Sequence, residues 1–123
     1  MEMFTVDLAT GDRSVFLAPW AEDPQPGASV ASAMFLDTEF SRLIATRAGS
    51  TSNLFSISMD TGAQRVISGL DPVAGSVVGR GPVPYGAMAL DVDADGVAYV
   101  GNAWIGAIFA IDLVSGDRVM IAR

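Results

Sequence analysis

The sequence contains no cysteine, no histidine and no lysine. Without cysteine there are no disulfides and no thiolate metal sites, and the redox compartment is left undetermined. Without histidine there are no imidazole ligands, no Ser-His-Asp triad and no side chain of the type that most often acts as general acid or base near neutral pH. Any chemistry must come from carboxylates, hydroxyls, amides, arginine or a bound cofactor.

Charge and long apolar runs are also scarce. Only 17% of the 123 residues are charged and 50% are hydrophobic, which indicates a globular chain rather than a disordered one. The net charge of -7 disfavours nucleic acid and anionic membranes and favours cations or basic partners. No stretch approaches the roughly twenty apolar residues of a membrane span, and the N-terminus lacks a secretory signal pattern. The protein is cytoplasmic if Met1 is the true start, and extracellular or periplasmic if the chain is a fragment of an exported parent.

One motif occurs three times, which indicates a repeat architecture. The three copies start at residues 3, 54 and 108 and read MFTVDLATGDR, LFSISMDTGAQ and IFAIDLVSGDR. Each copy alternates apolar and polar residues with the period of a strand and ends in a Thr-Gly or Ser-Gly turn. A second arm follows at 14–17, 64–68 and 118–122, so each motif predicts a β-hairpin.

The segments upstream of the second and third hairpins also match each other. A gap-free shift of 54 residues places Met34 on Met88 and Asp37 on Asp91. Residues 32–38 and 86–92 are predicted to form a first strand, and residues 42–48 and 97–103 a second. The Asp93-Ala-Asp-Gly96 segment between the latter pair is the strongest turn signal in the chain.

Four short antiparallel strands in each repeat of about fifty residues predict an all-β fold built from β-propeller blades. The chain then forms a single segment of about two and a half blades, with an outer half-blade at 3–17 and full blades at 32–68 and 86–122. The connectors, 18–30 and 69–85, are expected to be loops. A β-sandwich also has short strands and frequent turns, but it has no reason to repeat every second hairpin.

The segment from Ala89 to Asn102, followed by Ile108-Phe-Ala-Ile-Asp and a Gly-Asp-Arg turn, resembles the repeats of NHL-type and gluconolactonase-like six-bladed propellers. The Val-Asp-Leu-Ala-Thr-Gly-Asp-Arg element is particularly similar to repeats of uncharacterised bacterial propeller proteins. This resemblance covers nearly the whole chain and implies a fragment of a six-bladed propeller. Gluconolactonase-like members are hydrolases that hold a metal ion in the channel on carboxylate and asparagine ligands, which implies Asn102 as one ligand and places Ala48 at the equivalent position one repeat earlier.

The phase of the repeat predicts an incomplete ring. The chain starts at a third strand and ends after a fourth, so the first blade lacks its inner pair of strands. Identical copies cannot supply that pair, because each copy would contribute a surplus outer half. The simplest interpretation is part of a longer propeller, with exposed strand edges that invite self-association.

Three residues are candidate metal ligands: Asp37, Asp91 and Asn102. Asp37 and Asp91 occupy matching places near the end of a first strand, where their carboxylates could face the channel and bind a cation. The competing interpretation, which we prefer, is that each accepts hydrogen bonds from backbone amides of a neighbouring blade. The expected cofactor, if there is one, is a divalent cation: calcium, magnesium or zinc.

Four residues are candidate ligand-binding groups. Tyr85 and Trp104 are the aromatic residues best placed to reach a binding face, and Arg47 and Arg80 could bind a carboxylate or phosphate there. Packing between blades competes as an explanation for Trp104, and solvation for the arginines. By contrast, Phe4, Phe55 and Phe109 recur at one strand position and are expected in the core between blades, as are Met34 and Met88.

Two functions remain. The first is a non-catalytic module that binds a protein or small-molecule ligand, which the lack of any catalytic constellation favours. The second is a portion of a metal-dependent gluconolactonase-like hydrolase, in which the channel carboxylates and Asn102 hold a cation that activates water. Neither function includes nucleic acid or a membrane span.

Overall fold

The computed structural model describes residues 3–17, 30–48 and 53–123, and this part of the chain is all β, without a helix. Apolar alternation and glycine turns divide it into short strands, as the sequence predicts. The strands are β1 (Met3–Val6), β2 (Arg13–Leu17), β3 (Val30–Asp37), β4 (Arg42–Ala48), β5 (Asn53–Ser58), β6 (Gln64–Asp71), β7 (Ser76–Val78), β8 (Ala87–Val92), β9 (Val97–Asn102), β10 (Ala107–Asp112) and β11 (Arg118–Ala122).

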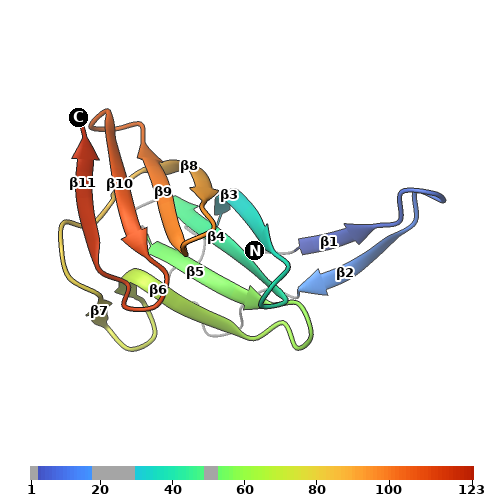
Figure 1. Cartoon of the computed structure of the whole chain (residues 1–123). Coiled ribbons are helices and arrows are strands. Elements are labelled where there is room, and N and C mark those ends of the chain that lie inside the picture. Colours follow the sequence, from blue (N-terminus) through green and yellow to red (C-terminus); the bar gives the residue numbers. More distant parts are fainter. Residues whose placement is uncertain (1–2, 18–29, 49–52) are drawn as a thin grey trace.

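The strands form three antiparallel sheets, and none of the described sheets closes on itself. The hairpin β1–β2 stands alone, the second sheet has the order β3-β4-β5-β6-β7, and the third has the order β8-β9-β10-β11. Figure 1 shows the hairpin projecting from one side of the molecule, with the third sheet on the other side. The all-β prediction is confirmed. The expected loop at 69–85 is wrong in part, because β6 extends into it and β7 pairs with β6 there.

The turn that follows the third strand of each repeat has the same geometry three times. It begins at Asp7, Ser58 or Asp112, whose side-chain oxygen accepts hydrogen bonds from the amides two and three residues later. The turn glycines are Gly11, Gly62 and Gly116, with φ angles of 76°, 72° and 75°. Such positive φ angles favour glycine, so this turn is set by local sequence in every copy.

The first two strands of the repeats align differently from the gap-free comparison. Phe55 in β5 lies opposite Ala45 in β4, and Phe109 in β10 lies opposite Val100 in β9. Ala45 therefore corresponds to Val100, whereas a shift of 54 residues would match it to Tyr99. By the same pairing Arg47, not Ala48, corresponds to Asn102.

The shift grows by one more residue in the first strands. Met34 lies opposite Ala45 and Leu90 opposite Val100, so Met34 corresponds to Leu90. Asp37 then corresponds to Asp93 rather than to Asp91. The physical reason is that the β8–β9 and β9–β10 loops are each one residue shorter than the β3–β4 and β4–β5 loops. A displacement of two residues along a strand keeps every side chain on its face.

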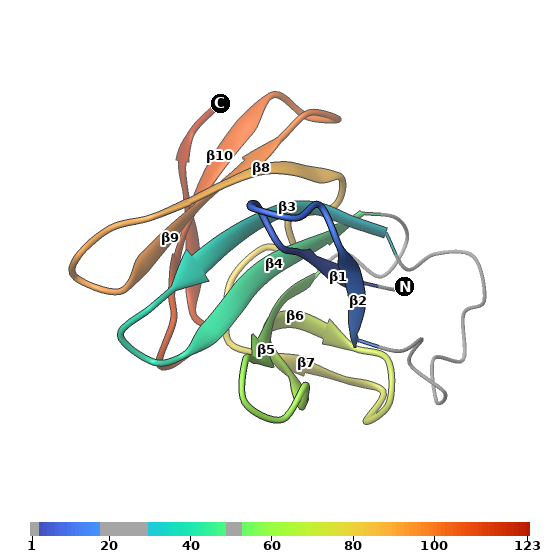
Figure 2. The same cartoon turned by 90° about the vertical axis from the view of Figure 1, so that its right-hand side faces the viewer.

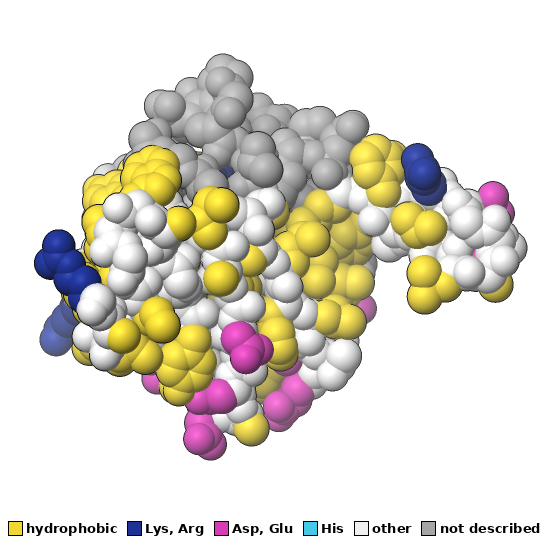
Figure 3. All heavy atoms as spheres, turned by 90° about the horizontal axis from the view of Figure 1, so that it is seen from above, with side chains coloured by type: hydrophobic (Ala, Val, Ile, Leu, Met, Phe, Trp, Pro, Cys, Tyr) yellow, Lys and Arg dark blue, Asp and Glu magenta, His cyan; other side chains and the backbone are white. Residues whose placement is uncertain are grey.

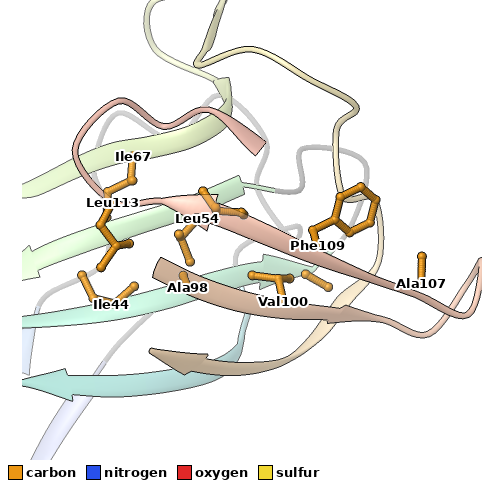
Figure 4. Packing of buried hydrophobic residues seen from close by; sticks show 10 residues of the cluster. Ile44, Leu54, Ile67, Ala98, Val100, Ala107, Phe109 and Leu113 are labelled. Carbon is orange, nitrogen blue, oxygen red and sulfur yellow. The ribbon is translucent and has the colours of Figure 1, made fainter. Parts of the chain in front are cut away.

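The main core lies between the second and third sheets. It brings Ile44, Leu54 and Ile67 of the second sheet against Val100, Phe109 and Ile111 of the third, together with four neighbours. Figure 4 shows these side chains meeting between the two sheets. The serine hydroxyls of Ser32 and Ser68 donate to the carbonyls of Ala87 and Gly116, each at 2.6 Å, and link the sheets at two points.

A smaller core joins the hairpin β1–β2 to the opposite face of the second sheet. Figure 2, viewed from the side of the hairpin, shows β1 and β2 in front of the second sheet. Met3 and Phe16 of the hairpin pack near Ala45, Phe55 and Ile57. The hairpin, the second sheet and the third sheet are therefore stacked in chain order. In both cores, a phenylalanine and an isoleucine of the third strand face the element that precedes their sheet in the chain. This Phe-Ile stripe consists of Phe55 and Ile57 in β5 and of Phe109 and Ile111 in β10.

The expected core residues divide between buried and exposed. Phe55 and Phe109 are each 1% exposed, as expected, but Phe4 at the same repeat position is 55% exposed, because nothing described lies against that face of the hairpin. Met34 and Met88, expected in the core, are each 56% exposed. Met88 lies at a β-bulge between Ala87 and Ala89, while Met34 lies on a face that β1–β2 covers only in part.

Candidate functional site

Asn102 links two segments of the chain at one end of the third sheet. Its side chain is buried, its amide nitrogen donates to the Tyr85 carbonyl, and its amide oxygen accepts from the backbone amides of Trp104 at 3.0 Å and Ile105 at 3.2 Å. The side chain therefore closes the β9–β10 turn and ties it to the loop before β8. This amide oxygen, the atom that a metal ion would need, already accepts two backbone hydrogen bonds.

Tyr85 and Trp104 lie on the two segments that Asn102 joins, and both are exposed, at 52% and 67%. A Cβ added to Gly86 would lie 2.6 Å from the Trp104 ring, so the indole packs directly on the Gly86 backbone. The structure thus places Tyr85 and Trp104 on neighbouring segments at one end of the third sheet. The Trp104 ring, held against Gly86 but exposed, suits ligand contact, because little side-chain freedom remains to be lost on binding.

Neither predicted arginine joins this aromatic pair as an exposed group. Arg47 is buried in the second sheet, and its guanidinium carbon lies 5.3 Å from the centroid of the Phe55 ring. Arg80 is exposed beside the β10–β11 turn, at the opposite end of the third sheet, where its backbone amide donates to Asp117 Oδ1 at 2.8 Å. The four predicted ligand-binding residues therefore lie in different environments.

The three predicted metal ligands are also separated. Asp37 forms an ion pair with Arg42, with a distance of 2.8 Å between Oδ2 and Nε. Asp91 accepts a hydrogen bond from the backbone amide of Val92 at 2.9 Å. Both aspartates lie beside hairpin turns at the end of the sheets opposite Asn102. In the described ranges, no group of three or more acidic side chains is arranged to hold a metal ion.

A cleft of about 730 Å³ lies at this opposite end, where the β3–β4 and β8–β9 turns approach each other. Its charged lining consists of Asp37, Glu39, Asp93, Asp95, Arg42 and Arg65. Leu36, Phe40, Leu113 and Val114 are among its apolar lining residues. Figure 3 shows acidic and apolar side chains gathered close together along one edge of the molecule. Four carboxylates against two guanidinium groups make the cleft acidic.

Local hydrogen bonds organise both sides of the cleft. Asp93 accepts from the backbone amides of Val97 and Asp95 and from the Tyr99 hydroxyl, and the bond from Val97 is the largest cause of its lowered pKa. The hydrogen bond between the Tyr99 hydroxyl and Asp93 raises the pKa of Tyr99. On the other side, Arg42 pairs with Asp37 while its guanidinium lies 4.9 Å from the centroid of the exposed Phe40 ring. Asp93 therefore remains ionised at neutral pH.

Arg118 is the residue that the sequence analysis missed. It is 3% exposed, and its guanidinium donates to the carbonyls of Pro82, Val78 and Gly81 and to the Ser68 hydroxyl, at 2.8 to 2.9 Å. A longer hydrogen bond of 3.4 Å joins Nη1 of Arg118 to the carbonyl of Gly116 in the same turn. Burial lowers its pKa.

The available signal for Arg118 was the Gly-Asp-Arg turn, which recurs at 11–13 and 116–118. The partners of Arg118 lie mainly 36 to 50 residues away in sequence, so the motif alone could not reveal them. The side chain joins the connector before β8 to the second and third sheets, which is a stabilising role rather than a binding one.

Comparison with protein-family models, with curated proteins and with solved structures finds no match for this chain. The described part of the chain also has no helix with the length and apolar character needed to cross a membrane. The function must therefore be argued from the arrangement of the chain's own residues.

Proposed function

We propose that this chain is a non-catalytic binding module built from β-propeller blades. The order of the sheets supports the blade interpretation. Each four-stranded unit runs in sequence from one edge to the other, and the Phe-Ile stripe of each sheet faces the preceding element. A sandwich pairs two sheets once, whereas blades repeat the same packing along the chain. Six blades in the complete ring remain part of this proposal.

The acidic cleft is the observation that carries the binding function. Its 730 Å³ volume falls within the range of small-ligand and peptide pockets. Carboxylates on both rims and the exposed Phe40 ring complement a basic group attached to an aliphatic stem, as in an arginine or lysine side chain. We therefore propose a basic peptide segment as the ligand. The net charge of -7 attracts such a segment over a longer range.

Tyr85 and Trp104 provide a second proposed contact surface, for an apolar or aromatic part of a protein or small molecule. The hydrogen bonds of Asn102 hold the backbone of both segments, and the Trp104 ring packs on Gly86. Because this surface lies at the other end of the third sheet, it is independent of the cleft.

The alternative of a metal-dependent hydrolase draws no support from the geometry. Asp91 pairs with Tyr99, and Asn102 lies three residues further along β9, so Asp91 and Asn102 are roughly 10 Å apart along the strand. The amide oxygen of Asn102 is already used by backbone hydrogen bonds. These three side chains could not bind one cation without rearrangement.

Titration of an oligo-arginine peptide, followed by calorimetry and by amide NMR shifts, tests the cleft. We expect binding that weakens with salt and shifts in the amides of residues 37–42 and 93–96. The double variant Glu39→Gln with Asp95→Asn removes two rim charges whose side chains make no described hydrogen bond, and should weaken binding about tenfold.

The matched control is the double variant Asp12→Asn with Asp60→Asn, which removes the same number of charges from two exposed turns that do not line the cleft. It lowers the net negative charge without touching the cleft. Equal losses in the cleft variant and in the control would mean that binding follows overall charge, and would refute the cleft as the site.

A further inference from the structure

Two apolar side chains of β3 are exposed where their counterparts in the third sheet are covered. Met34 and Leu36 are 56% and 52% exposed. Their structural counterparts, Leu90 and Val92 in β8, are partly buried and pack against the main core. The substitution of one apolar residue for another does not explain this difference in exposure. The difference lies in the strands that pack over the two faces.

The hairpin β3–β4 covers the apolar face of β8. Because β3 and β4 are the first two strands of their four-stranded unit, we call this an inner hairpin. β8 packs against β3 and β4 of the second sheet, and Phe35 of β3 and Ile44 of β4 belong to the core that meets Leu90 and Val92. The face that carries Met34 is packed instead by Met3 and Phe16 of β1–β2, which correspond to the outer strands of a blade. The hairpin therefore covers the outer half of this face and leaves the inner half open.

The strand edge beside this open face is also unoccupied in the described chain. The counterparts of β1 are β5 and β10, and each pairs on both sides, with β4 and β6 or with β9 and β11. β1 pairs with β2 alone among the described strands. An unpaired edge next to an uncovered apolar face accepts a further strand readily, because backbone hydrogen bonds and apolar burial are gained together. Figure 3 shows apolar side chains in the recess beside the projecting hairpin.

We propose that the free edge of β1 binds an inner β-hairpin of this same repeat, from polypeptide outside these 123 residues. The incoming strand pairs antiparallel with β1, and the hairpin covers Met34 and Leu36 as β3–β4 covers Leu90 and Val92. The inference rests on the blade interpretation and not on the ligand proposed for the cleft, so either can fail alone.

The internal pairings specify what the incoming strand carries. Opposite Phe55 and Ile57 in β5 lie Ala45 and Leu43. The corresponding positions in β10 face Val100 and Ala98. The strand that pairs with β1 is thus expected to place small or branched aliphatic residues opposite Phe4 and Val6. A second copy of the chain does not offer such a strand freely, because its own inner hairpins are already paired with β5 and β10.

The test uses an extended chain in which a copy of residues 30–52 precedes Glu2. This copy presents Phe35 and Ile44, the two side chains that cover the equivalent face in the third sheet. We expect amide hydrogen exchange at the free edge of β1 to slow about tenfold or more, and the melting temperature to rise by several degrees. The same hairpin added as a separate peptide to the unmodified chain should also slow exchange in β1, which tests the edge without changing the fold.

The matched control carries Phe35→Asp and Ile44→Asp in the added copy, and should lose the protection. Met34→Asp in the receiving sheet should change the melting temperature little in the unmodified chain, because the side chain is exposed, but should remove most of the gain in the extended chain. Fast exchange in β1 of an extended chain whose β9 and β10 amides exchange as before would overturn the proposal. So would protection of the same edge by dimerisation of the unmodified chain.

Discussion

Replacing Arg118 with methionine measures how much one buried guanidinium stabilises the stacked sheets. Methionine fills much of the same space, so the main loss is the set of hydrogen bonds to Pro82, Val78, Gly81 and Ser68. The partners are neutral, and a buried acceptor left without its donor costs about 1–3 kcal/mol. Gly81 and Pro82 are exposed residues, so water can replace the donor at their carbonyls in the variant, and the loss at Val78 and Ser68 together is about 3 kcal/mol.

The loss is large compared with the total stability of a domain of this size, about 5–15 kcal/mol. It should lower the melting temperature by about 10 °C and the urea midpoint by about 1.5 M. Urea unfolding followed by far-ultraviolet circular dichroism measures it. A steeper or shallower transition would show that the variant changes the surface exposed on unfolding or no longer unfolds in two states.

Arg13 provides the matched control for this experiment. It occupies the same place in the first Gly-Asp-Arg turn, but it is exposed on the projecting hairpin. Arg13→Met should change the free energy of unfolding by about 0.5 kcal/mol or less. An equal loss of stability in Arg118→Met and Arg13→Met would show that the hydrogen bonds of Arg118 contribute nothing to the packing of the sheets.

Two further predictions concern the turns. Gly116→Ala should lower the free energy of unfolding by about 3 kcal/mol, because a Cβ there would lie 2.1 Å from the Ile67 carbonyl oxygen and the φ of 75° is strained for alanine. Gly96→Ala has a similar φ of 79° but open space around it, and should cost about 1 kcal/mol. Equal losses in chemical denaturation would contradict the contact at Gly116. Folding holds the pKa values of Asp93 and Asp112 below the ordinary 3.8, so their contribution to stability is present above that pH and is lost as the pH falls through the lower folded values. Urea midpoints between pH 7 and pH 2 should therefore fall on the acid side, and Asp112→Asn should make that fall shallower; an unchanged slope would exclude the carboxylate.

Local chemistry made several features predictable. The three hairpin turns follow from an Asp or Ser that accepts backbone hydrogen bonds and a glycine that takes a positive φ, and both were visible in the sequence. The alternation of apolar residues gave the strands and the faces of the sheets. In the first strands the register error was two residues, which leaves every side chain on its correct face, so the alternation of residues did not reveal that Asp37 corresponds to Asp93 rather than to Asp91. In the second strands the error was one residue, which matched Ala48 instead of Arg47 to Asn102.

The candidate sites were harder to predict, because they depend on residues that are distant in sequence. The cleft forms where the β3–β4 turn meets the β8–β9 turn, more than fifty residues later, and no local pattern marks that meeting. Tyr85 and Trp104 were predicted to reach a binding face, and the structure shows both side chains exposed. Their support by Asn102 was missed, since the resemblance implied a metal ligand at that position.

The sequence by itself determined the repeat, the strands, the turns and the absence of histidine and cysteine chemistry, because these depend on neighbouring residues and on composition. The tertiary structure alone decided which copies of a repeated residue are buried. Phe4 and Phe109 occupy the same repeat position, yet one is 55% exposed and the other 1%, because burial depends on what lies across the sheet face. The same cause makes Arg118 a buried link between sheets while Arg13 remains at the surface.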